Sequence, residues 1–114
     1  MDFTKQKPIY LQIAETLCER ILQGEWEEGE RMASVRDVAF QMGVNANTVL
    51  RSFDYLQERN IIFNLRGVGY FLNDNAKKLI TKLQREEFLN EDWPTILRKI
   101  KLLGFSVEEL LKDL

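Results

Sequence analysis

Two residues, Gly43 and Val44, separate two short amphipathic patterns, and this arrangement restricts the fold more than any other feature of the chain. The first pattern covers residues 34–42 and opens with Ser34, which begins a variant of the capping box. The second pattern begins at Asn45, a residue suited to the start of a helix. Ala39 is small enough to let two helices approach closely, and glycine can adopt the backbone angles of a tight turn. The sequence therefore predicts a helix-turn-helix. Its apolar positions are Val35, Val38, Ala39, Met42, Val49, Leu50, Phe53 and Leu56.

Two β-prone runs follow the second helical pattern. They cover residues 61–63 and 70–72, and the residues between them are typical of a turn. The runs therefore predict a β-hairpin with Arg66 and Gly67 at its tip. A helix-turn-helix that is followed directly by a hairpin is a winged helix, in which the hairpin is the wing.

Helical patterns also precede and follow this winged helix. Apolar residues at a spacing of four predict a helix over residues 9–22. Residues 75–114 carry three short helical patterns, which are too few to bury their apolar stripes alone. We expect these helices to pack on the winged domain, on a partner subunit or on both, and we favour a partner subunit. The predicted fold is thus mainly α, with a winged helix-turn-helix domain over 1–73 and a helical dimerisation region over 74–114. The predicted dimer interface comprises Leu79, Leu83, Phe88, Trp93, Leu97, Ile100 and Leu103.

The residue types that the chain lacks limit the metal sites and the catalytic mechanisms that it can support. The chain has no histidine and a single cysteine, Cys18, so an intrachain disulfide cannot form and a structural zinc site is not expected. Histidine is the usual general base near neutral pH, and the chain has no glycine-rich phosphate loop or GxSxG motif either. We therefore expect no metal, no cofactor and no enzymatic activity. Cys18 occupies an apolar helical position and is expected to be buried.

Hydropathy and charge bear on location and partners. The longest apolar runs have three residues, and the first ten residues lack the apolar core of a secretion signal, so we predict a cytoplasmic protein without a membrane partner. The formal net charge is −2, but residues 34–72 carry four arginines against three acidic residues, which is net +1. This segment alone is positive, since residues 1–33 sum to −3 and residues 73–114 to 0. The distribution is slight support for a nucleic-acid partner.

Taken together, five stretches of the chain resemble the GntR family of bacterial transcription regulators, and within it the YtrA-like subfamily. The stretches are PIYLQI at 8–13, GEWEEGERM at 24–32, SVRDVA at 34–39, GVNANTV at 43–49 and LRGVGYFL at 65–72. The resemblance covers residues 8–72 continuously, and the motifs are specific when they occur jointly. The short helical tail in place of a large effector domain is what resembles the YtrA-like branch, which uses its tail mainly to dimerise.

The resemblance implies a sequence-specific DNA-binding transcriptional regulator, expected to be a homodimeric repressor of a near-palindromic operator. A recognition helix enters the major groove by its N-terminal residues, where Asn47 can read adenine and Thr48 can contact a phosphate or a thymine methyl group. In the family the wing reaches the minor groove, which suits Arg66. The predicted DNA-binding residues are Ser34, Arg36, Asn45, Asn47, Thr48, Arg51, Arg66 and Gly67.

Three positions depart from the family's pattern. Ala33 stands where the family often has proline, and Ala46 stands where YtrA-like members often have proline. Leu50 replaces a residue that is often basic or an amide, which leaves open whether one DNA contact is lost.

Other interpretations of the same residues stay open. Ser34 and Asn45 could serve as helix caps alone, and Arg36 could pair with a carboxylate. The acidic net charge and Leu50 favour an alternative function, a winged-helix protein–protein interaction module without DNA binding. Binding of a small-molecule effector also stays open. No polar cluster in the tail indicates a particular ligand, so none is named.

Overall fold

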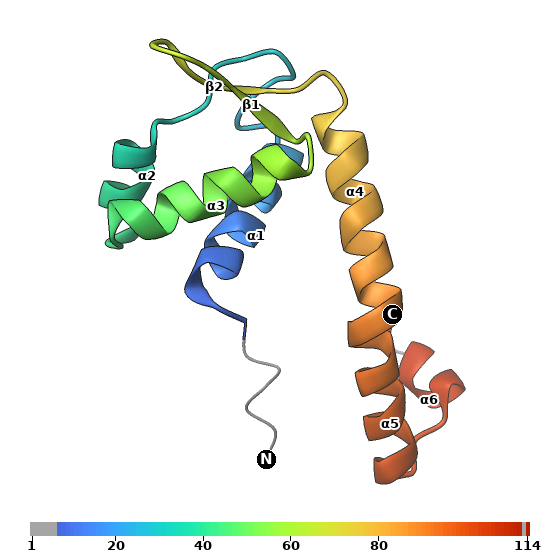
Figure 1. The fold of residues 1–114 in the computed structure, drawn as a ribbon. Coiled ribbons are helices and arrows are strands. Elements are labelled where there is room, and N and C mark those ends of the chain that lie inside the picture. Colours follow the sequence, from blue (N-terminus) through green and yellow to red (C-terminus); the bar gives the residue numbers. More distant parts are fainter. Residues whose placement is uncertain (1–6, 113) are drawn as a thin grey trace. The chain divides into compact units, whose positions relative to one another are not determined.

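The structure is a computed structural model, and it describes residues 7–112 and 114 (Figure 1). The chain divides into two compact units, one up to Ile80 and one from Thr81 to Leu114. The first unit holds α1, α2, α3, β1, β2 and the beginning of α4; the second holds the rest of α4, η2, α5 and α6. In chain order the elements are α1 (Ile9–Leu22), α2 (Val35–Met42), α3 (Ala46–Glu58), β1 (Ile62–Leu65), β2 (Gly69–Leu72), α4 (Ala76–Glu87), η2 (Phe88–Asp92), α5 (Trp93–Leu103) and α6 (Val107–Leu111).

The core of the first unit forms around α3, which packs against α1, α2 and β1. Phe53, in the middle of α3, is completely buried, and its ring meets the edge of the Tyr70 ring at 4.7 Å between centroids. Apolar side chains from every element of this unit join it. The largest of those that are completely or almost completely buried are Leu17, Ile21, Val38, Val49, Phe53, Leu56, Ile61, Ile62, Leu72 and Ile80.

The hairpin is antiparallel, and its register pairs Ile62 with Leu72 and Leu65 with Gly69. The segment before α2 pairs with β2 through an isolated bridge between Arg31 and Phe71. On either side of it the Leu72 N–H donates to the Glu30 carbonyl at 3.0 Å and the Met32 N–H donates to the Tyr70 carbonyl at 2.9 Å. The predicted mainly α fold with a two-stranded wing is confirmed. The functional division into a domain over 1–73 and a dimerisation region over 74–114 stays a prediction.

Cys18 is buried on the inner face of α1, as its apolar helical position predicted. Removal from water, with a smaller contribution from the nearby charges of Glu15 and Glu19, raises the pKa of the thiol to about 12. Burial disfavours the thiolate, which is the nucleophilic form of cysteine. Cys18 is therefore an inert core side chain rather than a reactive one.

The second unit differs from the expected separate helices, because α4, η2 and α5 follow one another without a loop. η2 is a π-helical turn in which the Trp93 N–H bonds to the Phe88 carbonyl. Pro94 stands in the first turn of α5 and has no N–H. Its ring would also clash with the carbonyl four residues earlier in a regular α-helix, so the wider turn lets the helix continue. Periodicity alone had indicated a break here.

Among residues 81–112 and 114 none is buried, although the unit is rich in apolar side chains. The most exposed of them are Leu89, Leu102, Leu103, Leu111 and Leu114. Across the described ranges, no helix is both long enough and apolar enough to cross a membrane.

Candidate nucleic-acid interface

The turn between α2 and α3 depends on the backbone conformation of Gly43. This residue caps α2 in the left-handed region, with φ 65° and ψ 36°. The N–H of Val44 then reaches back to the Ala39 carbonyl at 3.1 Å, which satisfies one of the last carbonyls of the helix. A Cβ at Gly43 would meet no atom within 4 Å. The glycine is therefore required for its dihedral angles and not for space.

The start of α2 carries two of the predicted contacts, Ser34 and Arg36. The Ser34 hydroxyl oxygen accepts from the Asp37 N–H at 3.1 Å, so Ser34 is the N-cap that its sequence position predicted. Its O–H is left to donate elsewhere. Arg36, in the first turn of the helix, is exposed.

The start of α3 divides its roles between two asparagines. Asn45 is the N-cap, and its side-chain oxygen accepts from the Asn47 N–H at 2.7 Å. The Asn47 side chain is exposed and hydrogen-bonds to no group in the described ranges. Asn45 is thus largely occupied by the helix, while the amide of Asn47 is available to a ligand. Thr48, the next residue, is half-buried.

A concavity of about 340 Å³ lies between the start of α1 and the first turns of α3. Three of the predicted DNA contacts line it together, Asn47, Thr48 and Arg51. On the opposite side it is lined by Pro8, Ile9 and Tyr10 of the first turn of α1. The remaining predicted contacts do not line this concavity.

Arginines of the first unit fall into two groups by their partners. Arg20 donates from Nε to Glu25 at 2.9 Å, which lowers the pKa of that carboxyl, and Arg59 pairs with Glu58 at 3.9 Å. In contrast, Arg36, Arg51 and Arg66 are exposed and form no ion pair with a carboxylate of the described residues. The three arginines predicted to contact DNA therefore keep charges that no carboxylate of the described residues neutralises.

The wing presents Arg66 and Gly67 in the connection between β1 and β2. The connection closes with a hydrogen bond from the Val68 N–H to the Leu65 carbonyl at 2.8 Å. Gly67 has φ 79°, and a Cβ there would meet no atom within 4 Å. The tip is thus a left-handed turn with open space around it, in which only Arg66 carries a charge.

Arg31 is a candidate contact that the sequence reasoning missed. It lies in the segment before α2, where it forms an isolated bridge with Phe71, and its side chain passes close to Gly69. A methyl group at Gly69 would stand 2.8 Å from Nε of Arg31. The absence of a side chain at Gly69 therefore makes space for the side chain of Arg31. Arg31 is exposed and pairs with no carboxylate that the structure describes. The sequence signal that could have indicated Arg31 is its position in GEWEEGERM, one of the stretches that resemble the family.

The predicted dimer residues are only partly covered by their own chain. Leu79, Leu83, Trp93, Leu97 and Ile100 are half-buried. The other two are exposed: Phe88, whose ring stacks on Trp93 at 6.4 Å, and Leu103, which is 67% exposed. Exposure of this kind is compatible with an interface, and the assignment stays a prediction. In the described residues no group of His, Cys, Asp and Glu could hold a metal ion.

Comparisons with known proteins agree with this geometry. The model of the bacterial regulatory proteins of the gntR family matches residues 9–72. The HTH-type transcriptional regulator YhcF of Bacillus subtilis is 32% identical over 99% of this chain and 92% of its own. The HTH-type transcriptional repressor YtrA of the same organism is 34% identical over 96% and 84%. A crystal structure of a GntR-family transcriptional regulator from Bacteroides thetaiotaomicron superimposes with a TM-score of 0.75 at 46% identity, covering 92% of this chain and 91% of that one.

Proposed function

The chain belongs to the gntR family of bacterial regulatory proteins, and from this premise we propose that it is a homodimeric repressor of a near-palindromic operator. It is a DNA-binding transcriptional regulator of the YtrA-like type. Its relative YtrA is named a repressor, which supports repression over activation. The family consists of regulators and not of enzymes, and we propose a cytoplasmic location because the protein must reach the bacterial chromosome.

The first two turns of α3 carry this proposal. Asn47 is exposed with its amide free, because Asn45 supplies the cap. Arg51 lines the same concavity and pairs with no described carboxylate. An amide and a guanidinium with free donors, presented together at the start of a helix, are the groups that read bases and bind phosphates in the major groove. Thr48, between them, would contact a phosphate or a thymine methyl group.

The remaining contacts would hold the protein in register on the duplex. In this proposal Arg31, Arg36 and Arg51 bind phosphates, while Arg66 enters the minor groove, whose negative potential attracts arginine. Gly67 lets the backbone of the tip approach the duplex. Ser34 would donate its hydroxyl proton to a phosphate at the start of α2, where free N–H groups also favour an anion.

Leu50 has a place in this scheme although it departs from the family's pattern. It is 41% exposed, three residues after Asn47 on α3. An apolar side chain in the major groove can pack against a thymine methyl group. We therefore propose that Leu50 makes an apolar contact instead of the polar one that other family members make.

The dimer is proposed from the apolar surface of the second unit. A unit of this size in which no described side chain is buried cannot stabilise itself by its own core. A second copy would cover the exposed leucines, and two winged helices would then contact half-sites about one helical turn apart, or a multiple of it.

Replacing Arg36 by alanine tests the DNA-binding role. We expect binding to weaken by about three- to tenfold on both specific and scrambled duplexes, and the slope of log Kd against log salt to fall by about one. The measurement is fluorescence anisotropy with the DNA upstream of the protein's own gene and a scrambled duplex, at several salt concentrations. Arg85→Ala, at an exposed position of α4, is the control and should bind like the wild type.

The same titration decides between the two candidate functions. Tight, salt-sensitive binding of the wild type to the upstream duplex and weak binding to the scrambled one supports the regulator. An unchanged affinity and slope for the Arg36→Ala variant would remove Arg36 from the interface. If the wild type binds neither duplex even at low salt, the protein-interaction module becomes the better explanation.

Replacing Leu103 by aspartate tests the dimer. Leu103 is largely exposed in one chain, so the substitution should leave the protomer folded. We expect self-association to weaken by about tenfold or more, because an unpaired carboxylate would have to be buried at the interface. Sedimentation equilibrium over a range of concentrations measures it. Phe40→Asp, at a highly exposed position of α2, is the control and should stay dimeric; equal self-association of both variants would place the interface elsewhere.

A further inference from the structure

Tyr10, in the first turn of α1, is held by two adjacent residues of α3. The guanidinium carbon of Arg51 lies over the Tyr10 ring, 4.0 Å from its centroid. The hydroxyl of Ser52 donates to the Tyr10 carbonyl at 2.7 Å, and Ser52 is completely buried. The side chain and the main chain of Tyr10 are therefore both fixed against the helix that carries Asn47 and Thr48.

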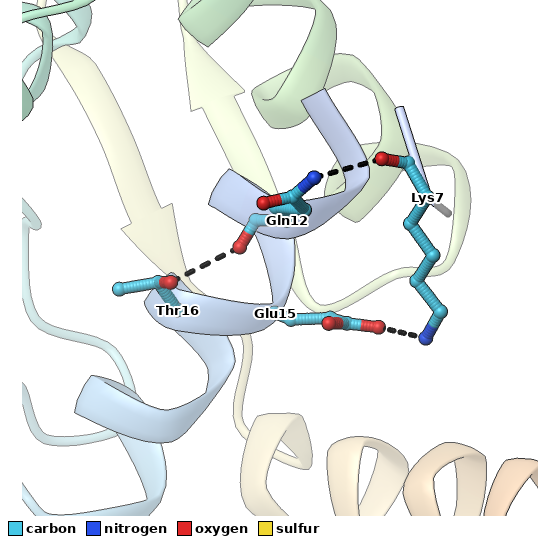
Figure 2. A network of polar contacts seen from close by, with 4 residues as sticks. All are labelled: Lys7, Gln12, Glu15 and Thr16. Atoms are coloured by element: carbon cyan, nitrogen blue, oxygen red, sulfur yellow. Dashed lines mark hydrogen bonds and ion pairs between the residues drawn. The ribbon is translucent and has the colours of Figure 1, made fainter. Parts of the chain in front are cut away.

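The chain that leads into Tyr10 is also fixed. Figure 2 shows Gln12 donating to the Lys7 carbonyl at 2.8 Å and the ammonium of Lys7 paired with Glu15. Thr16 in turn donates to the Gln12 carbonyl at 3.0 Å. These contacts bind Lys7, which precedes α1, to the helix itself. The Tyr10 ring therefore belongs to a first helical turn that these contacts hold in place.

A second aromatic ring supports Tyr10 from the side. Tyr55, one turn after Arg51 on α3, meets Tyr10 edge-on, with 6.3 Å between ring centroids and 70° between the ring planes. Arg59 lies over Tyr55 at 3.5 Å and pairs with Glu58. The two stacked arginines differ in one respect, because Arg51 is exposed and has no ion-pair partner among the described residues. The N–H donors of Arg51 therefore stay available to a ligand.

We propose that Tyr10 is a positioning residue for DNA binding, whose ring holds the Arg51 guanidinium beside Asn47 and Thr48 in the orientation that meets a phosphate. This inference rests on the proposed function. A free arginine side chain loses rotamer entropy when it binds. A guanidinium that is already stacked on an aromatic face loses less rotamer entropy when it binds, and this pre-organisation increases the affinity.

The test compares Tyr10→Leu with Tyr10→Phe. Phenylalanine keeps the ring, so we expect binding to the upstream duplex within about twofold of the wild type. Leucine removes the stacking, and we expect affinity to fall by about two- to fivefold, the range for an exposed cation–π contact. The salt slope of the leucine variant should stay at the wild-type value, because Arg51 still neutralises its phosphate once bound. Arg51→Ala should instead reduce the slope by about one.

A double variant separates positioning from a direct contact. In the Arg51→Ala background, Tyr10→Leu should cause no further loss, since the ring then has nothing to orient. A second readout needs no DNA: nuclear magnetic resonance should show the Arg51 side-chain protons shifted by the Tyr10 ring in the free protein, and Tyr10→Leu should abolish the shift.

Several outcomes would overturn the inference. The first is wild-type DNA affinity for Tyr10→Leu. The second is a loss of affinity for Tyr10→Phe equal to that of Tyr10→Leu, which would assign the effect to the hydroxyl. The third is additive losses of affinity in the double variant. A wild-type protein that binds no duplex at low salt would instead overturn the proposed function, and the inference with it. The two failures are therefore distinguishable from the wild-type titration alone.

Discussion

Replacing Phe53 by alanine is expected to lower the free energy of unfolding by about 3–5 kcal/mol. The side chain is 0% exposed, and its ring packs on the edge of Tyr70. The substitution removes this aromatic contact and leaves a cavity where α3 meets the hairpin. Small domains are stable by only about 5–15 kcal/mol, so much of the total would be lost. Urea denaturation followed by circular dichroism, at one fixed protein concentration, measures the difference.

Phe40 provides a matched control for this substitution. It is also a phenylalanine in a helix of the same unit, but it is 90% exposed. Phe40→Ala should change the unfolding free energy by no more than about 0.5 kcal/mol. A similar cost for both substitutions would mean that the loss comes from helix propensity or from the unfolded state, and not from burial.

Replacing Asn47 by alanine is expected to remove discrimination between base pairs. A good bidentate contact contributes about 1–3 kcal/mol of preference, so affinity for the operator should fall by about five- to 150-fold. Binding to a scrambled duplex should hardly change, because that binding rests on phosphates. Competition anisotropy with the upstream and the scrambled duplex measures the ratio directly. A panel of single base-pair changes would then identify the pair that Asn47 reads.

Asn45→Ser is the control for Asn47→Ala. Serine is a good N-cap, so this variant should keep both the stability and the preference of the wild type if Asn45 acts as a cap alone. An equal loss on both duplexes for Asn47→Ala would show a backbone contact in place of base readout. A loss of preference in Asn45→Ser would mean that Asn45 also reads the DNA.

Local interactions made much of the fold predictable. Ser34, Gly43 and Asn45 act on groups only two to five residues away, so their roles can be inferred from a short stretch of sequence. The same holds for the hairpin, whose strands are joined by a single turn. The similarity to YtrA over 96% of the chain confirms the resemblance drawn from these motifs.

Contacts between distant segments could not be predicted in the same way. Arg31 reaches Gly69 only because the segment before α2 pairs with β2. Tyr10 stacks on Arg51 only because α1 packs across the start of α3. Nothing in the spacing of either pair indicates that they meet. The π-helical turn before Pro94 was missed for another reason, since apolar periodicity does not distinguish a break in a helix from a wider turn.

The division of roles between Asn45 and Asn47 bears on how such a regulator can diverge. The oxygen of Asn45 secures the helix start through the main-chain N–H of Asn47, and any residue other than proline supplies that N–H. The side chain at position 47 is therefore not constrained by folding. A duplicated gene could exchange this residue, and with it the preferred operator, while the protein keeps its stability and avoids competing with its parent for the same promoters.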